Sequence, residues 1–274
     1  EYGIECLSKL NGIFGLAVFD TRSLDLFIAR DALGVKPLYY FSNDEVVCFS
    51  SEIKSLLELV PDELKPDYEA LQRYMTYLWC PGTGTPIKSI RKILPGELLT
   101  VRAGKIIDRK NWYKLPQTEI SKKIISGKEA VIQVRKGLFT AVDRQMVADV
   151  PVGAFLSGGL DSSAIVALAS KTAPDIRCFT IDPIGGSDND VVEDLPYAVE
   201  VAKHLKVDLE IVKIDADDLA NDLVAMVWQL DEPLADPAPL NVLYISRLAR
   251  QRGIKVLLSG SGGDDIFTGY RRHL

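Results

Sequence analysis

The sequence predicts two domains of different class: an α+β domain of sandwiched antiparallel sheets, followed by an α/β domain with a doubly wound parallel sheet. Short alternating apolar runs separated by turn residues fill the first half, whereas apolar strands alternate with amphipathic helices in the second half. The 274 residues leave room for two cores of ordinary size. We place the boundary near residue 115, which divides the chain into 1–115 and 116–274.

The first half is predicted to form short strands, because its alternating runs are rich in β-branched and aromatic residues. The expected strands are Ile13–Phe19, Leu24–Ala29, Leu38–Phe41, Val46–Phe49, Leu98–Val101 and Ile106–Ile107. The last two flank a hairpin turn at 102–105, and a helix is expected over Glu52–Leu59. The stretch from Pro61 to Gly104 carries strong chain breakers and is expected to pack between the domains.

The second half is predicted to alternate between helices and short buried strands. In chain order we expect a helix over Glu129–Val147, strand Val152–Leu156, helix Ser162–Ala173, strand Ile176–Ile181, helix Leu195–Leu205, strand Leu209–Ile214, a helix through Leu219–Val227, helix Val242–Ala249 and strand Ile254–Leu258. This alternation is typical of a parallel sheet, which binds ligands beyond the carboxyl ends of its strands where strand order reverses. We therefore expect chemistry directly after Leu156, Ile181 and Leu258.

Composition narrows the function classes. Apolar residues make up 47% and charged residues 26%, and the net charge of −6 includes no basic block, so neither nucleic acid nor a membrane surface is expected as a partner. The longest apolar runs are too short to span a membrane, and no signal-peptide pattern opens the chain. Four cysteines without CxxC spacing and two histidines argue against structural zinc. Free thiols in a reducing, cytoplasmic compartment are expected.

The stretch after the first strand of the second half has the chemistry of an anion cradle. It reads Ser157-Gly158-Gly159-Leu160-Asp161-Ser162-Ser163. Glycines permit positive φ and close backbone approach, so successive N–H groups can form a nest, and a helix beginning near Ser162 adds its positive end. Asp161 would repel phosphate unless a cation lay between them, which favours Mg²⁺. A plain glycine turn with a Ser/Asp cap is the alternative.

A second loop repeats this pattern after the last predicted strand. It reads Ser259-Gly260-Ser261-Gly262-Gly263-Asp264-Asp265. We expect Asp161 and Asp264 to share one or more cations that bridge the phosphates of a nucleotide, although a glycine turn again remains the alternative. The sequence contains neither GxxxxGK[ST] nor GxGxxG, which disfavours a Walker ATPase and a Rossmann dehydrogenase.

These loops carry a resemblance to a known family. SGGLDSS at 157–163 resembles the pyrophosphatase loop of the N-type ATP pyrophosphatases (adenine nucleotide α-hydrolase-like). With VADVPVGAFLSGGLDSS (147–163) and VLLSGSGGDDIFTGY (256–270), the second half closely resembles the synthetase domain of glutamine-hydrolysing asparagine synthetases. The first half resembles the later part of that family's glutaminase domain, an Ntn-hydrolase sandwich, through GIFGLAVFD (12–20), ARDALGVKPLYY (29–40), FSSEIKSL (49–56) and IRKILPGELLTV (90–101).

The resemblance implies a ligase of asparagine biosynthesis, with 1–115 as the end of a class II glutamine amidotransferase domain and 116–274 as the start of the ATP pyrophosphatase domain. ATP would adenylate a carboxylate, L-aspartate first of all, with release of pyrophosphate, and ammonia from glutamine would then form the amide, AMP and glutamate. The resemblance leaves open whether the protein forms a homodimer. The implied ATP and pyrophosphate-binding residues are Phe155, Leu156, Ser157, Gly158, Gly159, Asp161, Ser162, Ser163, Ile181, Ser259 and Gly260. Asp161 and Asp264 are the implied catalytic Mg²⁺ ligands.

Three departures from the family pattern limit these implications. Glu1 aligns inside the glutaminase domain, so its cysteine nucleophile has no counterpart here, and the chain stops before the region that carries a catalytic lysine; we expect a fragment lacking both ends. Ser261 stands where the family commonly has an acid, and serine cannot act as the same general base. Another carboxylate of a sugar or secondary metabolite, a β-lactam-synthetase-like cyclase, and a non-catalytic nucleotide-binding partner therefore remain alternatives.

Two further groups of charged residues have competing interpretations. Asp231-Glu232-Pro233 and Asp236-Pro237 resemble an active-site loop of many family members, but they fit a helix stop followed by proline breakers equally well. Arg30, Asp31 and Lys36 are expected to have a structural role through ion pairing in a hairpin.

Overall fold

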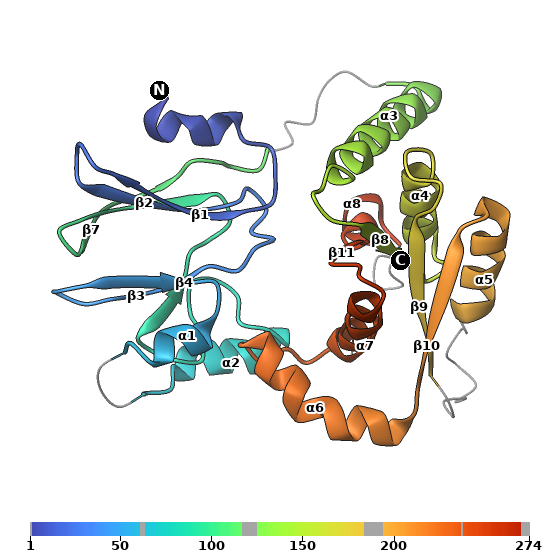
Figure 1. Ribbon diagram of the computed structural model, residues 1–274. Coiled ribbons are helices and arrows are strands. Elements are labelled where there is room, and N and C mark those ends of the chain that lie inside the picture. Colours follow the sequence, from blue (N-terminus) through green and yellow to red (C-terminus); the bar gives the residue numbers. More distant parts are fainter. Residues whose placement is uncertain (1, 61–63, 117–124, 184–193, 237, 270–274) are drawn as a thin grey trace. The chain divides into compact units, whose positions relative to one another are not determined.

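The computed structural model describes residues 2–60, 64–116, 125–183, 194–236 and 238–269. It divides the chain into two compact units, whose elements are labelled in Figure 1. Unit 1 comprises Glu1–Ile120 together with Val227–Asp236, and unit 2 comprises Ser121–Met226 and Pro237–Leu274. In this part of the chain no helix is long and apolar enough to cross a membrane.

Unit 1 contains two antiparallel sheets, with strand orders β1-β2-β6-β7 and β4-β3-β5. Its elements are η1 (Gly3–Lys9), β1 (Gly15–Asp20), β2 (Asp25–Arg30), β3 (Tyr39–Ser42), β4 (Val47–Ser50), α1 (Ile53–Leu57), α2 (Tyr68–Tyr77), β5 (Ile90–Lys92), β6 (Glu97–Arg102) and β7 (Lys105–Asn111). The first four predicted strands are present, each starting one or two residues later than expected.

The core of unit 1 lies between its two sheets. Ile28 of β2 and Leu99 of β6 pack there against Tyr40 of β3. On the outer side of the three-stranded sheet, Tyr39 packs with Leu56 of α1. The outer face of the four-stranded sheet is covered by η1. Because side chains point alternately to the two sides of a strand, each sheet has apolar side chains packed on both of its faces. The predicted sandwich of antiparallel sheets is present in unit 1.

The hairpin between β6 and β7 follows from two residues. Arg102 pairs with Lys105, so Ala103 and Gly104 form the turn, and both have positive φ as a tight hairpin of this type requires. A Cβ on Gly104 would lie 2.2 Å from the backbone oxygen of Glu45. Glycine is therefore required at 104 by both its conformation and its contact.

The stretch of chain breakers from Pro61 to Gly104 contains the ten-residue helix α2 and the strand β5. Its expected packing between the domains stays a prediction. Asp67 caps α2 by accepting a hydrogen bond from the backbone N–H of Ala70 (3.0 Å). Pro66 and Pro81 lie just outside the helix, where they do not interrupt its hydrogen bonds. The prolines therefore delimit a helix rather than exclude one.

Unit 2 contains a parallel sheet with strand order β10-β9-β8-β11. Its elements are α3 (Gly127–Gln145), β8 (Val152–Phe155), α4 (Leu160–Ala169), β9 (Arg177–Pro183), α5 (Asp194–Leu205), β10 (Asp208–Ile214), α6 (Ala216–Leu230), α7 (Ala238–Gln251), β11 (Val256–Leu258) and α8 (Gly263–Phe267). All the helices and strands predicted for this half are present with shifted ends, and α8 is an addition.

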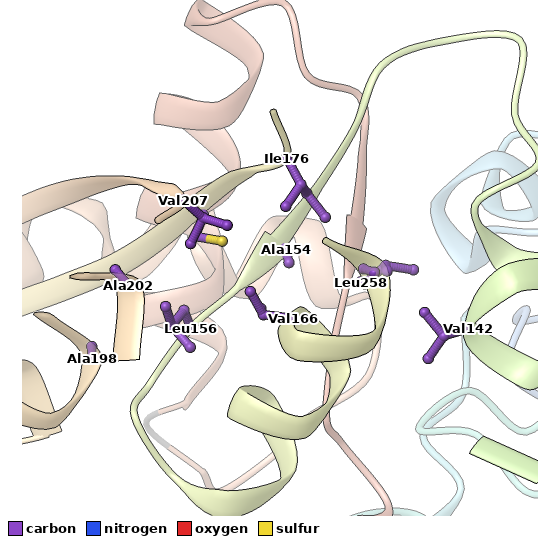
Figure 2. Close-up of a cluster of buried hydrophobic side chains, with 11 residues drawn as sticks. Val142, Ala154, Leu156, Val166, Ile176, Ala198, Ala202, Val207 and Leu258 are labelled. Atoms are coloured by element: carbon purple, nitrogen blue, oxygen red, sulfur yellow. The ribbon is translucent and has the colours of Figure 1, made fainter. Parts of the chain in front are cut away.

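Both faces of this sheet are covered by helices. On one face, Ala154 and Cys178 pack with Val166 of α4 and Ala198 of α5, and Figure 2 shows this cluster. The next residues along β8 and β9 point the other way, and Phe179 packs there against Ile245 and Ala249 of α7. The sheet is therefore doubly wound as predicted, and strand order reverses beside β8, between β9 and β11.

Candidate functional site

The candidate site lies where β8 and β11 end, at the reversal of strand order. The loop after β8 turns sharply through Gly158, whose φ is +84°. A Cβ at this position would lie 2.5 Å from the backbone nitrogen of Ala198 and 2.6 Å from the Cβ of Tyr197. Only glycine lets the loop pass this close to α5.

The loop then enters α4 at Gly159, its N-cap residue, which supplies no side-chain cap. The first N–H groups of the helix consequently lack the partner that a serine or aspartate cap would give them, and they lie at the positive end of the helix. Asp161 is in this first turn and is partly exposed. A helix start of this kind can bind an anion, and the anion cradle at this loop stays a prediction.

The hydroxyl groups of the loop divide into two kinds. Ser157 and Ser162 share a hydrogen bond between their Oγ atoms (3.0 Å), and Ser162 Oγ also donates to the carbonyl of Gly159 (3.2 Å). These two side chains therefore hold the loop closed. The hydroxyl of Ser163 is inaccessible to solvent and has no hydrogen-bond partner among the described residues. Such an unpaired donor is costly in the folded protein.

The second loop, after β11, lies directly against the first. A Cβ on Gly260 would come within 2.8 Å of the backbone nitrogen of Ser162 and 3.0 Å of the Cβ of Asp161. A Cβ on Gly263 would lie 1.8 Å from Oδ2 of Asp161. The two loops that the sequence singles out are thus brought together, with two glycines making room for one carboxylate. Gly263 was missed as a site residue, although its glycine-rich surroundings are the signal that could have identified it.

Asp264 lies in the first turn of α8, and its carboxylate lies beside Gly269, where a Cβ would be 1.8 Å from Oδ1. In the described part of the chain, no three histidine, cysteine or acidic side chains are grouped as a metal centre. Two carboxylates of this kind nevertheless suit Mg²⁺ bound together with phosphate oxygens, since Mg²⁺ commonly keeps few protein ligands. Mg²⁺ ligation by Asp161 and Asp264 stays a prediction.

Ser261 is held by its own loop. Its Oγ shares a 2.7 Å hydrogen bond with Oγ of Ser259, and its backbone N–H donates to the same Ser259 oxygen (3.1 Å). Position 261 therefore presents a neutral hydroxyl, already paired, where the resemblance implies a carboxylate.

The three apolar residues predicted to surround the adenosine are divided between the two faces of the sheet. Phe155 and Ile181 are partly buried and pack on the face covered by α7. Leu156 is 1% exposed and packs on the opposite face, in the cluster of Figure 2. Its side chain belongs to the core, which leaves its backbone as the part that can meet a ligand.

Asp231 and Glu232 belong to unit 1, where the structure shows their contacts. The interpretation of this stretch as an active-site loop stays a prediction. Glu232 pairs with Lys92 and accepts a hydrogen bond from Tyr39, while Asp231 pairs with Lys54. The proline of the Asp236-Pro237 pair lies outside the described residues. Burial and the Glu232 carboxylate raise the pKa of Tyr39, which keeps its hydroxyl a donor.

Arg30 and Asp31 are structural, but through different contacts from those expected. The buried Asp31 carboxylate accepts backbone hydrogen bonds from Leu33, Val35 and Lys36 (2.9–3.2 Å). The Arg30 guanidinium donates to backbone carbonyls, among them that of Ile93 (2.8 Å). The predicted ion pairing was therefore wrong, because both side chains satisfy backbone groups of a tight turn.

All four cysteines are free thiols, as expected from their spacing. Burial raises the pKa of the Cys178 thiol to about 12, and burial together with Glu232 raises that of Cys80. Both thiols therefore stay protonated at neutral pH and are poor nucleophiles.

Comparison with known proteins assigns the two parts of the sequence to two family models. Residues 133–274 match the family model described as "Asparagine synthase", and residues 1–113 match the model described as "Glutamine amidotransferase domain". Asparagine synthetase [glutamine-hydrolyzing] 1 of Bacillus subtilis (strain 168) is 35% identical over 276 residues, which cover 98% of this chain and 41% of that protein.

Two other relatives extend the range of similar proteins. Putative asparagine synthetase [glutamine-hydrolyzing] 2 of Methanocaldococcus jannaschii is 32% identical over 279 residues, covering 100% of this chain and 52% of that protein. Amidase chyE of Penicillium rubens is 31% identical over 287 residues, which cover 98% of this chain and 41% of that protein. The chain thus spans about two fifths to one half of the length of these relatives.

Proposed function

This chain belongs to the asparagine synthase family, and we propose that the protein is an ATP-dependent amidotransferase, a carbon–nitrogen ligase of the EC 6.3.5.4 type. One observation carries the proposal: two glycine-rich loops at the ends of β8 and β11 meet around Asp161. The match of residues 1–113 to a glutamine amidotransferase domain supports glutamine as the source of ammonia.

The proposed reaction has two steps. An oxygen of the acceptor carboxylate attacks the α-phosphorus of ATP, the bond to the bridging oxygen of the β-phosphate breaks, and pyrophosphate leaves with that electron pair. Ammonia then attacks the acyl carbon of the adenylate, loses a proton, and displaces AMP to form the amide.

The residues of the two loops have distinct proposed roles. The nest at Ser157–Gly159 and the N-terminal N–H groups of α4 bind the departing pyrophosphate, with the Ser163 hydroxyl as a further donor. Ser157 and Ser162 keep the loop closed in the shape that presents these donors. Asp161 and Asp264 would hold Mg²⁺, which supplies charge neutralisation for the phosphates. Phe155 and Ile181, and Ser259 and Gly260 on the second loop, are proposed to line the adenosine.

L-Aspartate is the acceptor that we propose first, because the similar relatives are named asparagine synthetases. Ser261 supports a second candidate, a different carboxylate acceptor. Its hydroxyl is paired with Ser259 and carries no charge, so the loop offers no carboxylate at that position to hold the ammonium group of aspartate or to act as a base.

The test is pyrophosphate exchange into ATP by the purified protein with Mg²⁺ and single carboxylates. Exchange that depends on L-aspartate, followed by asparagine formation when glutamine is added, would support the first candidate. Exchange with another carboxylate and not with aspartate would support the second. Absence of exchange with every acceptor, despite ATP binding, would contradict the ligase proposal and favour a nucleotide-binding partner.

A further inference from the structure

Gly263 is the first residue of α8, at a position where the backbone itself does not require glycine. Its φ lies outside the left-handed region, whereas Gly262 before it has φ of +92°. Alanine forms helices more readily than glycine, because glycine loses more backbone freedom on folding. A reason outside α8 must therefore account for glycine at position 263.

The side chain of Asp161 supplies that reason. A Cβ on Gly263 would overlap the Asp161 carboxylate, since the three nearest atoms are Oδ2, Cγ and Oδ1 of this side chain. Gly260 has different neighbours, because a Cβ there would lie 2.8 Å from the backbone nitrogen of Ser162 and 3.0 Å from the backbone carbon of Asp161. Gly260 thus lets the backbones of the two loops approach each other, and Gly263 leaves the space that a carboxylate occupies.

The second loop is held by its own hydrogen bonds, and the Asp161 side chain is not. The backbone N–H of Ser261 donates to Ser259 Oγ (3.1 Å), and the N–H of Gly263 donates to the carbonyl of Gly260 (3.2 Å). Within the described residues the Asp161 carboxylate has neither a hydrogen bond nor an ion pair. A methyl group added at position 263 would therefore displace the carboxylate and leave the loop in place.

The place that Gly263 leaves for the Asp161 carboxylate is next to the second acid of the candidate site. Strands β8 and β11 pair in parallel, with Leu258 opposite Ala154, so both loops leave the same edge of the sheet. Asp161 lies in the first turn of α4, and Asp264 directly follows Gly263 in α8. Two carboxylates can share a cation only when no other group separates them. Space at position 263 is therefore a condition for the predicted Mg²⁺ site.

We propose that Gly263 is a positioning residue: because it has no side chain, the Asp161 carboxylate lies against the start of α8, where Asp161 and Asp264 bind Mg²⁺ together with the phosphates of ATP. Gly263 itself touches neither the metal nor the nucleotide. A side chain at position 263 turns the Asp161 carboxylate away from the second loop while both loops keep their fold. The metal part of this proposal rests on the proposed function, whereas the competition between a side chain at 263 and the Asp161 carboxylate does not.

The first test is a double-mutant cycle of Gly263→Ala and Asp161→Ala, titrated calorimetrically with ATP in the presence of Mg²⁺. Gly263→Ala alone should weaken the affinity about tenfold, because the displaced carboxylate no longer ligates the metal. In the Asp161→Ala background the same substitution should change the affinity by less than about twofold, because the group that it displaces is gone. Gly127→Ala is the matched control, since Gly127 is also the first residue of a helix in unit 2 and a Cβ there has no atom within 4 Å.

A titration with ATP in EDTA separates a metal effect from a general one. Without Mg²⁺, Gly263→Ala and the unaltered protein should bind ATP equally well. An equal loss of affinity with and without Mg²⁺ would overturn the role toward the metal. An unchanged affinity in Gly263→Ala, or an equal loss in both Asp161 backgrounds, would show that Gly263 does not act through Asp161.

Thermal unfolding without any ligand tests the contact independently of the proposed function. In the Asp161→Ala background, Gly263→Ala should leave the unfolding midpoint unchanged or raise it, as Gly127→Ala does, because alanine favours a helix. In the unaltered background the same substitution should lower the midpoint by about 2 °C, because the carboxylate is forced into another rotamer. An equal change of the midpoint in both backgrounds would overturn the contact, whatever the activity of the protein.

Two safeguards keep these outcomes separate. Should Gly263→Ala fail to fold, the double variant with Asp161→Ala should fold, because removal of the carboxylate leaves room for the methyl group. If neither variant folds, the side chain at 263 conflicts with a group other than Asp161, and the proposal is overturned. Should the unaltered protein bind no ATP in the presence of Mg²⁺, the proposed function has failed, and the thermal cycle alone decides whether Gly263 accommodates the Asp161 carboxylate.

Discussion

Asp31 in unit 1 follows strand β2 and Asp161 in unit 2 begins helix α4 shortly after β8, both with glycines nearby in sequence, yet their surroundings are opposite. The Asp31 carboxylate is buried and accepts three backbone hydrogen bonds from its own turn. The Asp161 carboxylate lies beside Gly260 and Gly263 of another loop, and no donor bonds it within the described residues.

The difference shows how a structural acid can be told from a candidate functional acid. A carboxylate whose lone pairs are taken by backbone N–H groups stabilises a turn and has little left to offer a ligand. A carboxylate that keeps its lone pairs has bonding capacity left for a ligand. Sequence alone shows an aspartate near glycines in both places.

Substitution of Asp161 should give the largest functional effect. Asp161→Asn keeps the shape but removes the charge, and it should lower pyrophosphate exchange at least about a hundredfold if Asp161 holds Mg²⁺. The midpoint of thermal unfolding should change little, because the carboxylate makes no protein hydrogen bond that is lost. Asp175→Asn, at an exposed acid before β9, is the control. A small loss of pyrophosphate exchange together with a large loss of stability would show that Asp161, like Asp31, has a structural role.

Substitution of Asp31 should give the opposite pattern. Asp31→Ala leaves three partly buried backbone N–H groups without their acceptor and should reduce the free energy of unfolding of unit 1 by about 3 kcal/mol. Urea unfolding followed by Trp112 fluorescence measures this, since Trp112 bonds to the carbonyl of the neighbouring Arg30. The exposed Asp44→Ala should be near neutral. If ATP binding fell together with stability in Asp31→Ala, the contrast between a structural Asp31 and a functional Asp161 would be contradicted.

The buried thiol of Cys178 allows the stability of the core of unit 2 to be tested without altering the two loops. The folded-state pKa of Cys178 is raised by burial to about 12 from 9.0, so the folded state keeps a proton that the unfolded chain loses. Its contribution to stability is complete below pH 9 and decreases as pH rises toward 12, by up to about 1.4 kcal/mol per pH unit. Urea unfolding between pH 8 and 11 should show this slope, and Cys178→Ala should flatten it. An equal slope in both proteins would contradict the assignment.

Removal of the unpaired hydroxyl should give the smallest effect and the sharpest contrast. Ser163→Ala removes a buried group that has no partner, so the free energy of unfolding should stay within about 0.5 kcal/mol or rise slightly. Affinity for ATP should fall about fivefold, because a hydrogen bond to the nucleotide is lost. Calorimetric titration with ATP and thermal unfolding measure the two effects. An unchanged affinity for ATP would show that the Ser163 hydroxyl does not bind the nucleotide.

Local patterns in the sequence were sufficient for much of this molecule. The loops at 157–163 and 259–265 identified the family, which the matches confirm. Strand and helix periodicity predicted a doubly wound sheet, which unit 2 has. These features depend on neighbouring residues, because glycines, side-chain alternation and helix ends act over a few positions. The assignment of the first half to an Ntn-hydrolase sandwich stays a prediction.

Other features depend on residues that meet only in the folded chain, and the sequence could not supply them. Ser162 and Ser163 are adjacent and chemically identical, yet one closes the loop and the other is left unpaired. Asp231 and Glu232 resemble an active-site loop in sequence. In the structure they form ion pairs with Lys54 and Lys92, which lie more than a hundred residues away in the chain. Local sequence determined which groups are present in this protein. The tertiary structure decided which of them remain unsatisfied, because hydrogen bonds and ion pairs depend on distance in space.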